Sequence, residues 1–237
     1  MLTHALGCLG AALSMSLSWP QVFKSCVRRR TTGLSATASS LGVAMPIGWI
    51  TYGLLSGERL QIVTNVVTGT AGLAIMVALL ATQPAMRARG ALRRIAAAAA
   101  LVVAPVLLSG LATAFPGVRP SQIAPLLGLV LAGVSVISAI PQPLSLLRDR
   151  HQDLSGLSPA RWRMGAGAAA SWLIYGLGTA QPAVWASAGA GLTSALIVCA
   201  ILHLRREPTP VLHPVGSTGA ARWRDSVTTR TLAMAGI

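Results

Sequence analysis

Residues 19–35 read WPQVFKSCVRRRTTGLS, and a stretch with the same order of features, IPQPLSLLRDRHQDLSGLS, covers residues 140–158. Each stretch places Pro-Gln at the end of an apolar run, followed by a basic loop and then Gly-Leu-Ser. Pro20-Gln21 and Pro141-Gln142 are 121 residues apart, and an apolar segment with a tryptophan and Tyr-Gly follows each copy. The chain therefore contains two collinear copies of one unit, and a repeat on this scale determines the fold.

The composition is that of a membrane protein. Hydrophobic residues make up 53% of the 237 residues and charged residues only 10%, whereas an ordinary soluble domain has roughly 25% charged residues. Runs of about 20 apolar residues are long enough to cross a bilayer as helices. The sequence contains seven such runs, at residues 2–23, 34–55, 60–82, 95–115, 123–147, 157–177 and 183–204.

The net charge of +14 lies between these runs, apart from Arg161 and Arg163 at the start of the run 157–177. All Lys and Arg residues except Arg59 and Arg119 fall in or next to alternate loops and in the C-terminal tail. The positive-inside rule then places the N-terminus outside the cell membrane and the C-terminus in the cytoplasm. We expect the basic loops to set this multi-pass topology and to contact anionic lipid, and we expect no nucleic-acid partner. The excess of arginine over lysine and the alanine-rich runs indicate a bacterial source.

The predicted fold is an all-α membrane protein with seven transmembrane helices in a 3+1+3 parallel repeat. Residues 1–82 form the first triple-helix bundle, residues 83–121 a linker with the fourth helix, and residues 122–206 the second bundle. Because each unit has an odd number of helices, the linker helix is needed to give both units the same orientation. Residues 207–237 lack apolar periodicity, which predicts a disordered cytoplasmic tail.

The unit resembles the PQ-loop family, especially the SemiSWEET and SWEET sugar transporters. The residues that carry the resemblance are the two Pro-Gln pairs, the basic loops, Gly-Leu-Ser, Trp49-Ile50-Thr51-Tyr52-Gly53 and Thr64-Asn65-Val66. The resemblance covers about residues 1–82 and 122–206. It implies a solute site near the middle of the membrane, walled by a tryptophan of the second helix and an asparagine of the third helix in each bundle.

The residues of the first unit independently favour a pocket. Trp49 lies seven residues before Ser56 and Asn65 lies eight after Gly57, so both are about 10 Å below the outer turn. An indole can stack on a sugar ring, and a carboxamide can donate and accept hydrogen bonds with hydroxyls. Two alternatives remain open: tryptophan also populates the membrane interface, and asparagine also joins helices.

The second unit departs from the pattern. Trp172 is equivalent to Trp49, but the residue equivalent to Asn65, 123 positions later, is Ala188, with Ser187 beside it. We therefore predict an asymmetric pocket, for which a smaller or less hydroxylated solute is an alternative to a sugar. The predicted substrate-binding residues are Trp49, Asn65, Trp172 and Ser187.

The Pro-Gln pairs predict a hinge or inner gate. Pro20 and Pro141 lie near the inner ends of their helices, where a missing amide hydrogen loosens the helix and allows bending. The alternative is that proline is simply frequent in membrane helices. Gln21 and Gln142 are expected to satisfy the backbone groups that the prolines free.

These observations predict facilitative, uncoupled transport of a small neutral solute, with a sugar as the first choice. None of the five acidic residues lies inside a predicted span, although a proton relay normally needs a buried carboxylate or histidine. No catalytic motif or metal-ligand spacing occurs, so we expect no enzyme activity, cofactor or metal. An amino-acid or other metabolite exporter and a non-transporting receptor or scaffold are the alternatives, and a homo-oligomer remains open.

Overall fold

The computed structural model describes residues 1–32, 34–149, 154 and 157–205, and it is helical wherever these residues form regular structure. Residues 1–202 form one compact unit, to which the following description applies. The predicted disordered tail, 207–237, lies outside the described residues. The helices are α1 (Leu2–Val22), α2 (Ala36–Ser56), α3 (Arg59–Thr82), α4 (Arg89–Thr113), α5 (Pro120–Ala139), α6 (Pro141–Arg148), α7 (Pro159–Gly178) and α8 (Pro182–Leu204). A π-helical turn, Phe23–Val27, follows α1, and a 3-10 turn, Pro84–Arg87, precedes α4.

Five segments are long and apolar enough to cross a membrane: α2, α3, α4, the continuous stretch Pro120–Arg148 that contains α5 and α6, and α8. The helices α1 and α7 are of similar length, 21 and 20 residues, which corresponds to about 30 Å. They are less apolar because α1 carries several serines and α7 begins with Arg161 and Arg163. Each of the seven predicted runs is therefore helical, but two of them are less apolar than the other five.

Two predicted boundaries were wrong. The helix expected from residue 95 begins at Arg89, because arginine and alanine favour helix as strongly as the apolar residues that follow. The helix expected over 123–147 is interrupted at Ile140, between α5 and α6. Pro141 has no N–H to donate to the carbonyl of Ile137, which instead accepts from the Ile140 N–H at 3.4 Å.

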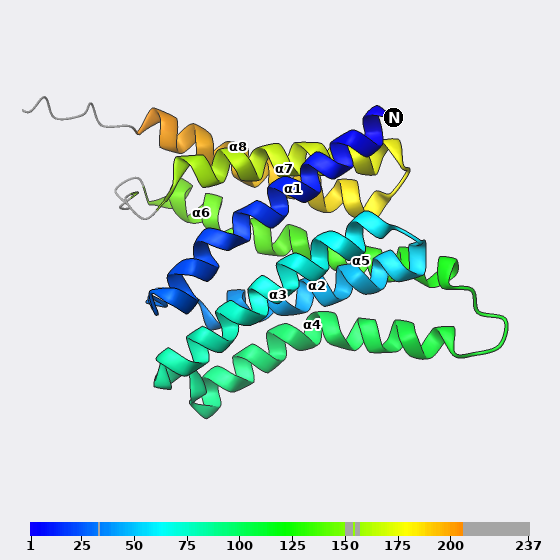
Figure 1. Ribbon diagram of the computed structural model, residues 1–237, viewed down its shortest axis with the longest axis horizontal. Helices are drawn as coiled ribbons and strands as arrows, with labels where there is room; N and C mark the ends of the chain where they lie inside the picture. Colours follow the sequence, from blue (N-terminus) through cyan, green and yellow to red (C-terminus); the bar gives the residue numbers. More distant parts are fainter. Residues whose placement is uncertain (33, 150–153, 155–156, 206–237) are drawn as a thin grey trace, which may run out of the picture. The chain divides into compact units, whose positions relative to one another are not determined.

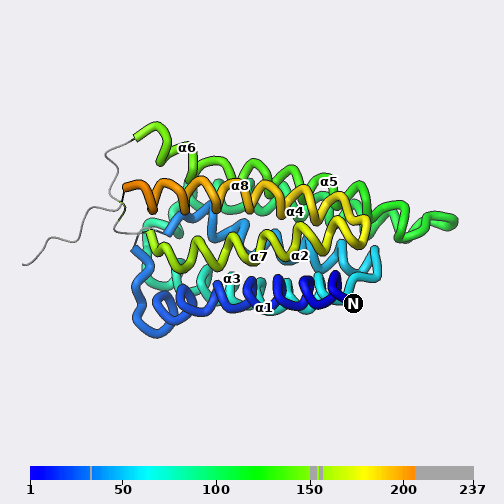
Figure 2. The backbone as a smooth tube through the Cα atoms, turned by 90° about the horizontal axis from the view of Figure 1, so that it is seen from above, coloured from blue at the N-terminus to red at the C-terminus, as the bar shows by residue number. Residues whose placement is uncertain are grey.

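The two sequence repeats contact each other through equivalent pairs of helices. The repeat relates α1 to α5, α2 to α7 and α3 to α8. Helix α1 packs against α3 and α7, and α2 packs against α3, α4 and α5 (Figures 1 and 2). The α1–α7 contact and the α2–α5 contact are therefore repeat equivalents of each other. Both contacts join one sequence unit to the other.

The two ends of the bundle differ in charge. The N-terminus, the α2–α3 turn, the α4–α5 loop and the α7–α8 turn lie at one end (on the right in Figure 1), here called the N-terminal end. The opposite end, here called the basic end, holds the connections that follow α1 and α3. All described Lys and Arg residues except Arg59 and Arg119 belong to connections or helix termini at this basic end.

The core lies between the two units and toward the N-terminal end. Tyr52, Val102, Leu127, Leu131 and Tyr175 are its largest members, and each is at most 5% exposed. They come from α2, α4, α5 and α7, so the linker helix α4 contributes to the same core through Val102. This packing fixes the helices whose other faces surround the pocket described next.

Candidate functional site

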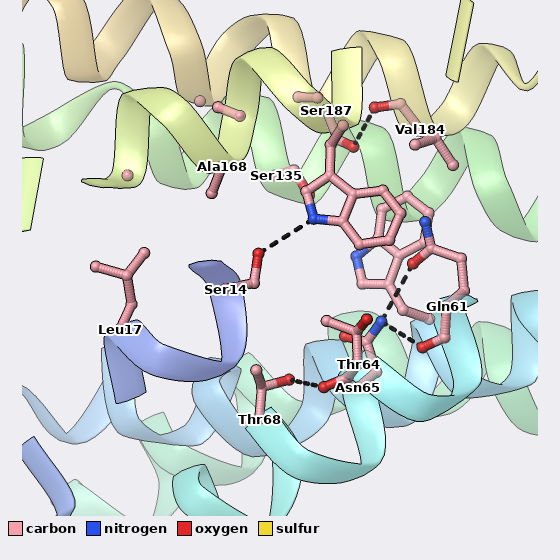
Figure 3. A pocket seen from close by; sticks show the side chains of 16 residues that line it. Ser14, Leu17, Gln61, Thr64, Asn65, Thr68, Ser135, Ala168, Val184 and Ser187 are labelled. Atoms are coloured by element: carbon pink, nitrogen blue, oxygen red, sulfur yellow. Dashed lines mark hydrogen bonds between the residues drawn. The ribbon is translucent and has the colours of Figure 1, made fainter. Parts of the chain in front are cut away.

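A pocket of about 360 Å³ lies between the two units and is lined by α1, α2, α3, α5, α7 and α8 (Figure 3). The four residues predicted to bind substrate, Trp49, Asn65, Trp172 and Ser187, all lie in its wall. Sites for small molecules usually have volumes of roughly 300 to 1,000 Å³. The structure thus brings the predicted residues together around one space of suitable size.

The repeat symmetry extends to the pocket wall, beyond the pairs noticed in the sequence. The wall contains hydroxyls from both units at equivalent positions, and these come from α1 and α5 as well as from α3 and α8. The equivalent pairs are Ser14 and Ser135, Trp49 and Trp172, and Thr64 and Ser187. Of these hydroxyl residues only Ser187 was predicted, because a hydroxyl in a membrane helix gives no signal until its face is known.

Both tryptophans are held edge-on against a tyrosine of their own helix. The ring centroids of Trp49 and Tyr52 are 5.5 Å apart at an interplanar angle of 80°, and those of Trp172 and Tyr175 are 5.5 Å apart at 85°. The indole Nε1 of Trp172 also donates to the Ser14 hydroxyl at 3.1 Å. The Trp172 ring is therefore positioned by α1, a helix of the other unit.

One wall of the pocket is polar and belongs to α3. Gln61, Thr64, Asn65 and Thr68 follow the i, i+3, i+4, i+7 spacing of one helix face and all line the pocket. The Asn65 Nδ2 donates to the Gln61 backbone carbonyl at 2.8 Å and to the Gln61 Oε1 at 3.2 Å. The Thr68 hydroxyl donates to the Thr64 backbone carbonyl at 3.0 Å. Sequence reasoning found Asn65 and missed the other three residues.

The opposite wall belongs to α8 and is mostly apolar (Figure 3). It presents Val184, Ser187, Ala188 and Gly191 to the pocket. The Ser187 hydroxyl donates to the Val184 backbone carbonyl of its own helix at 3.0 Å. The absence of an amide from the second unit, predicted from Ala188, is thus accompanied by small or apolar residues along the whole wall.

At the N-terminal end, two crossed hydrogen bonds link the units. The Tyr175 hydroxyl donates to the Glu58 Oε2 at 2.5 Å, and the Tyr52 hydroxyl donates to the Gln181 Oε1 at 3.4 Å. Glu58 and Gln181 are repeat equivalents, 123 residues apart. Each tyrosine therefore reaches the turn between the last two helices of the other unit. These contacts close the bundle between the pocket and the N-terminal end.

The same tyrosines pack on equivalent glycines. A Cβ atom at Gly7 would lie 2.6 Å from the ring of Tyr175, and one at Gly128 would lie 2.8 Å from the ring of Tyr52. Gly7 and Gly128 are 121 residues apart, as the Pro-Gln pairs are. Only a residue without a side chain allows each ring to approach the opposite unit so closely.

A second cavity, of about 690 Å³, lies at the basic end. It shares Leu17 and Gly165 with the pocket, so the two spaces are neighbours along the bundle. Three of the four predicted gate residues, Pro20, Gln21 and Gln142, lie in the wall of the cavity, and Pro141 does not. The Gln21 side chain donates to the Ser25 hydroxyl at 2.9 Å, so its expected bond to a freed backbone group was wrong.

The pocket wall contains no ionisable side chain, whereas the cavity at the basic end is lined by Lys24 and Arg161. Over the described ranges, no group of three or more His, Cys, Asp or Glu residues is arranged to hold a metal ion. The chemistry available in the pocket is therefore hydrogen bonding and aromatic stacking with a neutral molecule.

The unequal crossed bonds generate a prediction about stability. Tyr175→Phe removes a short bond to a carboxylate, which is worth about 1.5 to 3 kcal/mol. Tyr52→Phe removes a long bond to a neutral amide, worth about 1 kcal/mol or less. Thermal unfolding of the purified protein in detergent should therefore show the larger loss of Tm for Tyr175→Phe. Equal losses for the two substitutions would contradict this difference.

Comparison with known proteins gives a match at the level of structure. No protein-family model matches the chain, and no curated protein sequence matches it. A solved structure of a eukaryotic SWEET transporter superposes with a TM-score of 0.67 at 18% sequence identity, covering 86% of this chain and 96% of the other. The resemblance in fold that the Pro-Gln repeats predict is confirmed by this match: the chain has the fold of a SWEET transporter.

Proposed function

We propose that this protein is a facilitative transporter that moves a small neutral solute, with a sugar as the first choice, across the cell membrane by alternating access. The observation that carries the proposal is the pocket between two repeat-related units, closed toward the N-terminal end and adjoining a cavity at the basic end. A transporter needs one site that can be reached from either side in turn. The fold shared with a SWEET transporter supports the same function.

We further propose the 3+1+3 arrangement of seven spans, in which α5 and α6 together form the fifth span and α1 and α7 count as spans despite their lower apolarity. Some polar groups of α1 and α7 bond to each other inside the bundle, as Ser14 and Trp172 do, so lipid need not solvate them. Arg161 and Arg163 lie near the start of α7 at the basic end. The charge bias places the basic end in the cytoplasm and the N-terminus outside.

Transport is proposed to be uncoupled from a proton gradient. The pocket wall offers no carboxylate or histidine that could carry a proton with the solute. Glu58, the acidic residue that helps to close the N-terminal end, lies at the α2–α3 turn rather than in the pocket. Accumulation of solute in response to an imposed pH gradient would contradict an uncoupled mechanism.

The prolines are proposed to act as hinges. Pro20 lies in the last turn of α1, three residues before the π-helical turn begins, and Pro141 begins α6 after the interruption at Ile140. Each unit thus has an irregular backbone close to its Pro-Gln pair, after Pro20 in the first unit and one residue before Pro141 in the second. Such irregularities allow helices to bend without breaking further hydrogen bonds.

Substitution of Asn65 tests the pocket. In proteoliposomes, counterflow of labelled sugars should fall at least about tenfold for Asn65→Ala, because a hydrogen-bonding amide is lost from the wall. The matched control is Val66→Ala, the next residue, which is 49% exposed on the outer face of α3. Normal counterflow by Asn65→Ala would exclude the pocket as the transport site.

Absence of counterflow for every sugar and amino acid tested with the unmodified protein would favour a receptor or scaffold.

The hinge proposal predicts that Pro20→Ala combined with Pro141→Ala slows counterflow while the Tm is kept or raised, because both helices become more regular. Pro182→Ala is the control, because Pro182 begins α8 after a turn, whereas Pro141 stands where α5 would otherwise continue into α6. An unchanged rate for the double variant would show that bending at these positions is not needed.

A further inference from the structure

The two facing walls of the pocket differ at equivalent positions in a consistent direction. Three residues of α3 with hydrogen-bonding side chains correspond to residues of α8 without one, and only one position keeps a hydroxyl in both units. The pairs are Gln61 and Val184, Thr64 and Ser187, Asn65 and Ala188, and Thr68 and Gly191. One wall has therefore kept or gained polar groups, and the other lacks them.

Thr64 carries the most informative group of the polar wall. Its side chain is 4% exposed, and its Oγ1 is buried without a hydrogen-bond partner, alone among the buried side-chain polar atoms of the described residues. Native proteins leave very few such atoms unsatisfied, because each costs about 1 to 3 kcal/mol. Thr64 is one of the residues that line the pocket, so a bound molecule that reaches this side chain with a donor or acceptor would satisfy its hydroxyl.

Gln61 and Asn65 add a donor and an acceptor on the same side of the pocket (Figure 3). Their mutual hydrogen bond uses the Asn65 Nδ2 and the Gln61 Oε1. The Gln61 Nε2 and the Asn65 Oδ1 have no partner within the part of the chain that the structure describes. Together with the Thr64 hydroxyl, α3 thus offers three hydrogen-bonding groups within slightly more than one helical turn.

The wall of α8 can offer few hydrogen bonds to a solute. Val184 is 2% exposed and, like Ala188, has no polar side-chain atom. The proton of the Ser187 hydroxyl is used by the Val184 carbonyl, which leaves the oxygen only as an acceptor. A solute hydroxyl placed against Val184 and Ala188 would lose its water without gaining a partner, which is unfavourable.

On the basis of the transport function proposed above, we propose that the solute is a one-sidedly polar neutral molecule, of the size of a monosaccharide, with hydrogen-bonding groups toward α3 and apolar groups toward α8. Thr64 is then a specificity-determining residue, and Gln61 binds solute beside Asn65. A fully hydroxylated sugar is a poorer solute than a deoxy sugar with one apolar side.

The test compares D-glucose with 6-deoxy-D-glucose in proteoliposome counterflow, since these probes differ by one hydroxyl. We expect the unmodified protein to prefer the deoxy sugar by about fivefold, because a desolvated and unpaired hydroxyl opposes binding. Val184→Gln combined with Ala188→Asn copies the α3 residues onto α8 and should reverse the preference. Ala188→Ser adds a smaller polar group and should reduce the preference, which keeps the test valid if the double variant does not fold.

Substitution of Thr64 provides a second, independent test of the proposal. Thr64→Val keeps the shape of the side chain and removes the hydroxyl, whereas Thr64→Ser keeps the hydroxyl. Counterflow of 6-deoxy-D-glucose should be about fivefold lower for Thr64→Val than for Thr64→Ser, which corresponds to one net hydrogen bond. Equal rates for these two variants would overturn the role of Thr64, because a purely structural role would follow side-chain volume instead.

The outcomes separate this inference from the transport function itself. Counterflow of both sugars with glucose preferred, or with a preference that Ala188→Ser and the double variant leave unchanged, overturns the one-sided pocket and leaves transport intact. Counterflow of neither sugar nor of any other monosaccharide overturns both proposals. Preference for the deoxy sugar, reversed by the polar α8 variant, supports both.

Discussion

The crossed contacts of Tyr52 and Tyr175 hold the two units together, and the rest of the structure depends on them. In lipid, apolar surface gives little drive for helices to associate, so close packing and hydrogen bonds between helices must do so. Each tyrosine meets both needs: its ring lies against a glycine of the other unit, and its hydroxyl bonds to the turn of that unit. With the units joined at the N-terminal end, the space between them remains as the pocket and the adjoining cavity.

Because these contacts are symmetric, the two copies of the repeat together form one candidate binding site. Gly7 and Gly128, the two tyrosines, and the two pocket tryptophans occupy equivalent positions, so each unit supplies half of one interface. The same relation brings Ser14 and Ser135 into one wall. The two copies of the unit carry different residues at positions where packing does not require the same residue. Glu58 corresponds to Gln181 in the closure, and Asn65 corresponds to Ala188 in the pocket.

Much of the fold was predictable from the sequence, because membrane helices and internal repeats leave strong signals. The apolar runs predicted where the helices lie, and the matching positions of Pro-Gln, Trp and Tyr-Gly predicted two equivalent units. The predicted binding residues lie around one pocket for the same reason, since Trp49 and Asn65 share a depth below a common turn. Their role in binding remains a prediction.

Other features required knowledge of which helix faces meet. Thr64 and Gln61 are ordinary residues in an apolar run, and their polar character matters only because α3 turns them toward α7 and α8. Glu58 lies in the α2–α3 turn, and nothing in the sequence predicts that the hydroxyl of Tyr175, 117 positions away, donates a hydrogen bond to it. The interruption at Ile140 depends on one lost N–H, which a hydropathy pattern does not reveal.

A disulfide across the N-terminal end tests most directly whether the two units must separate there during transport. A Cβ atom at Gly178 of α7 would lie 3.4 Å from the Cβ of Thr3 of α1, close to the spacing of about 3.5 to 4.5 Å in disulfides. Thr3→Cys with Gly178→Cys is made in a chain whose native Cys8, Cys26 and Cys199 are replaced by alanine. Alternating access predicts that oxidation stops counterflow and that a reductant restores it. Undiminished counterflow by the fully cross-linked protein would contradict the mechanism.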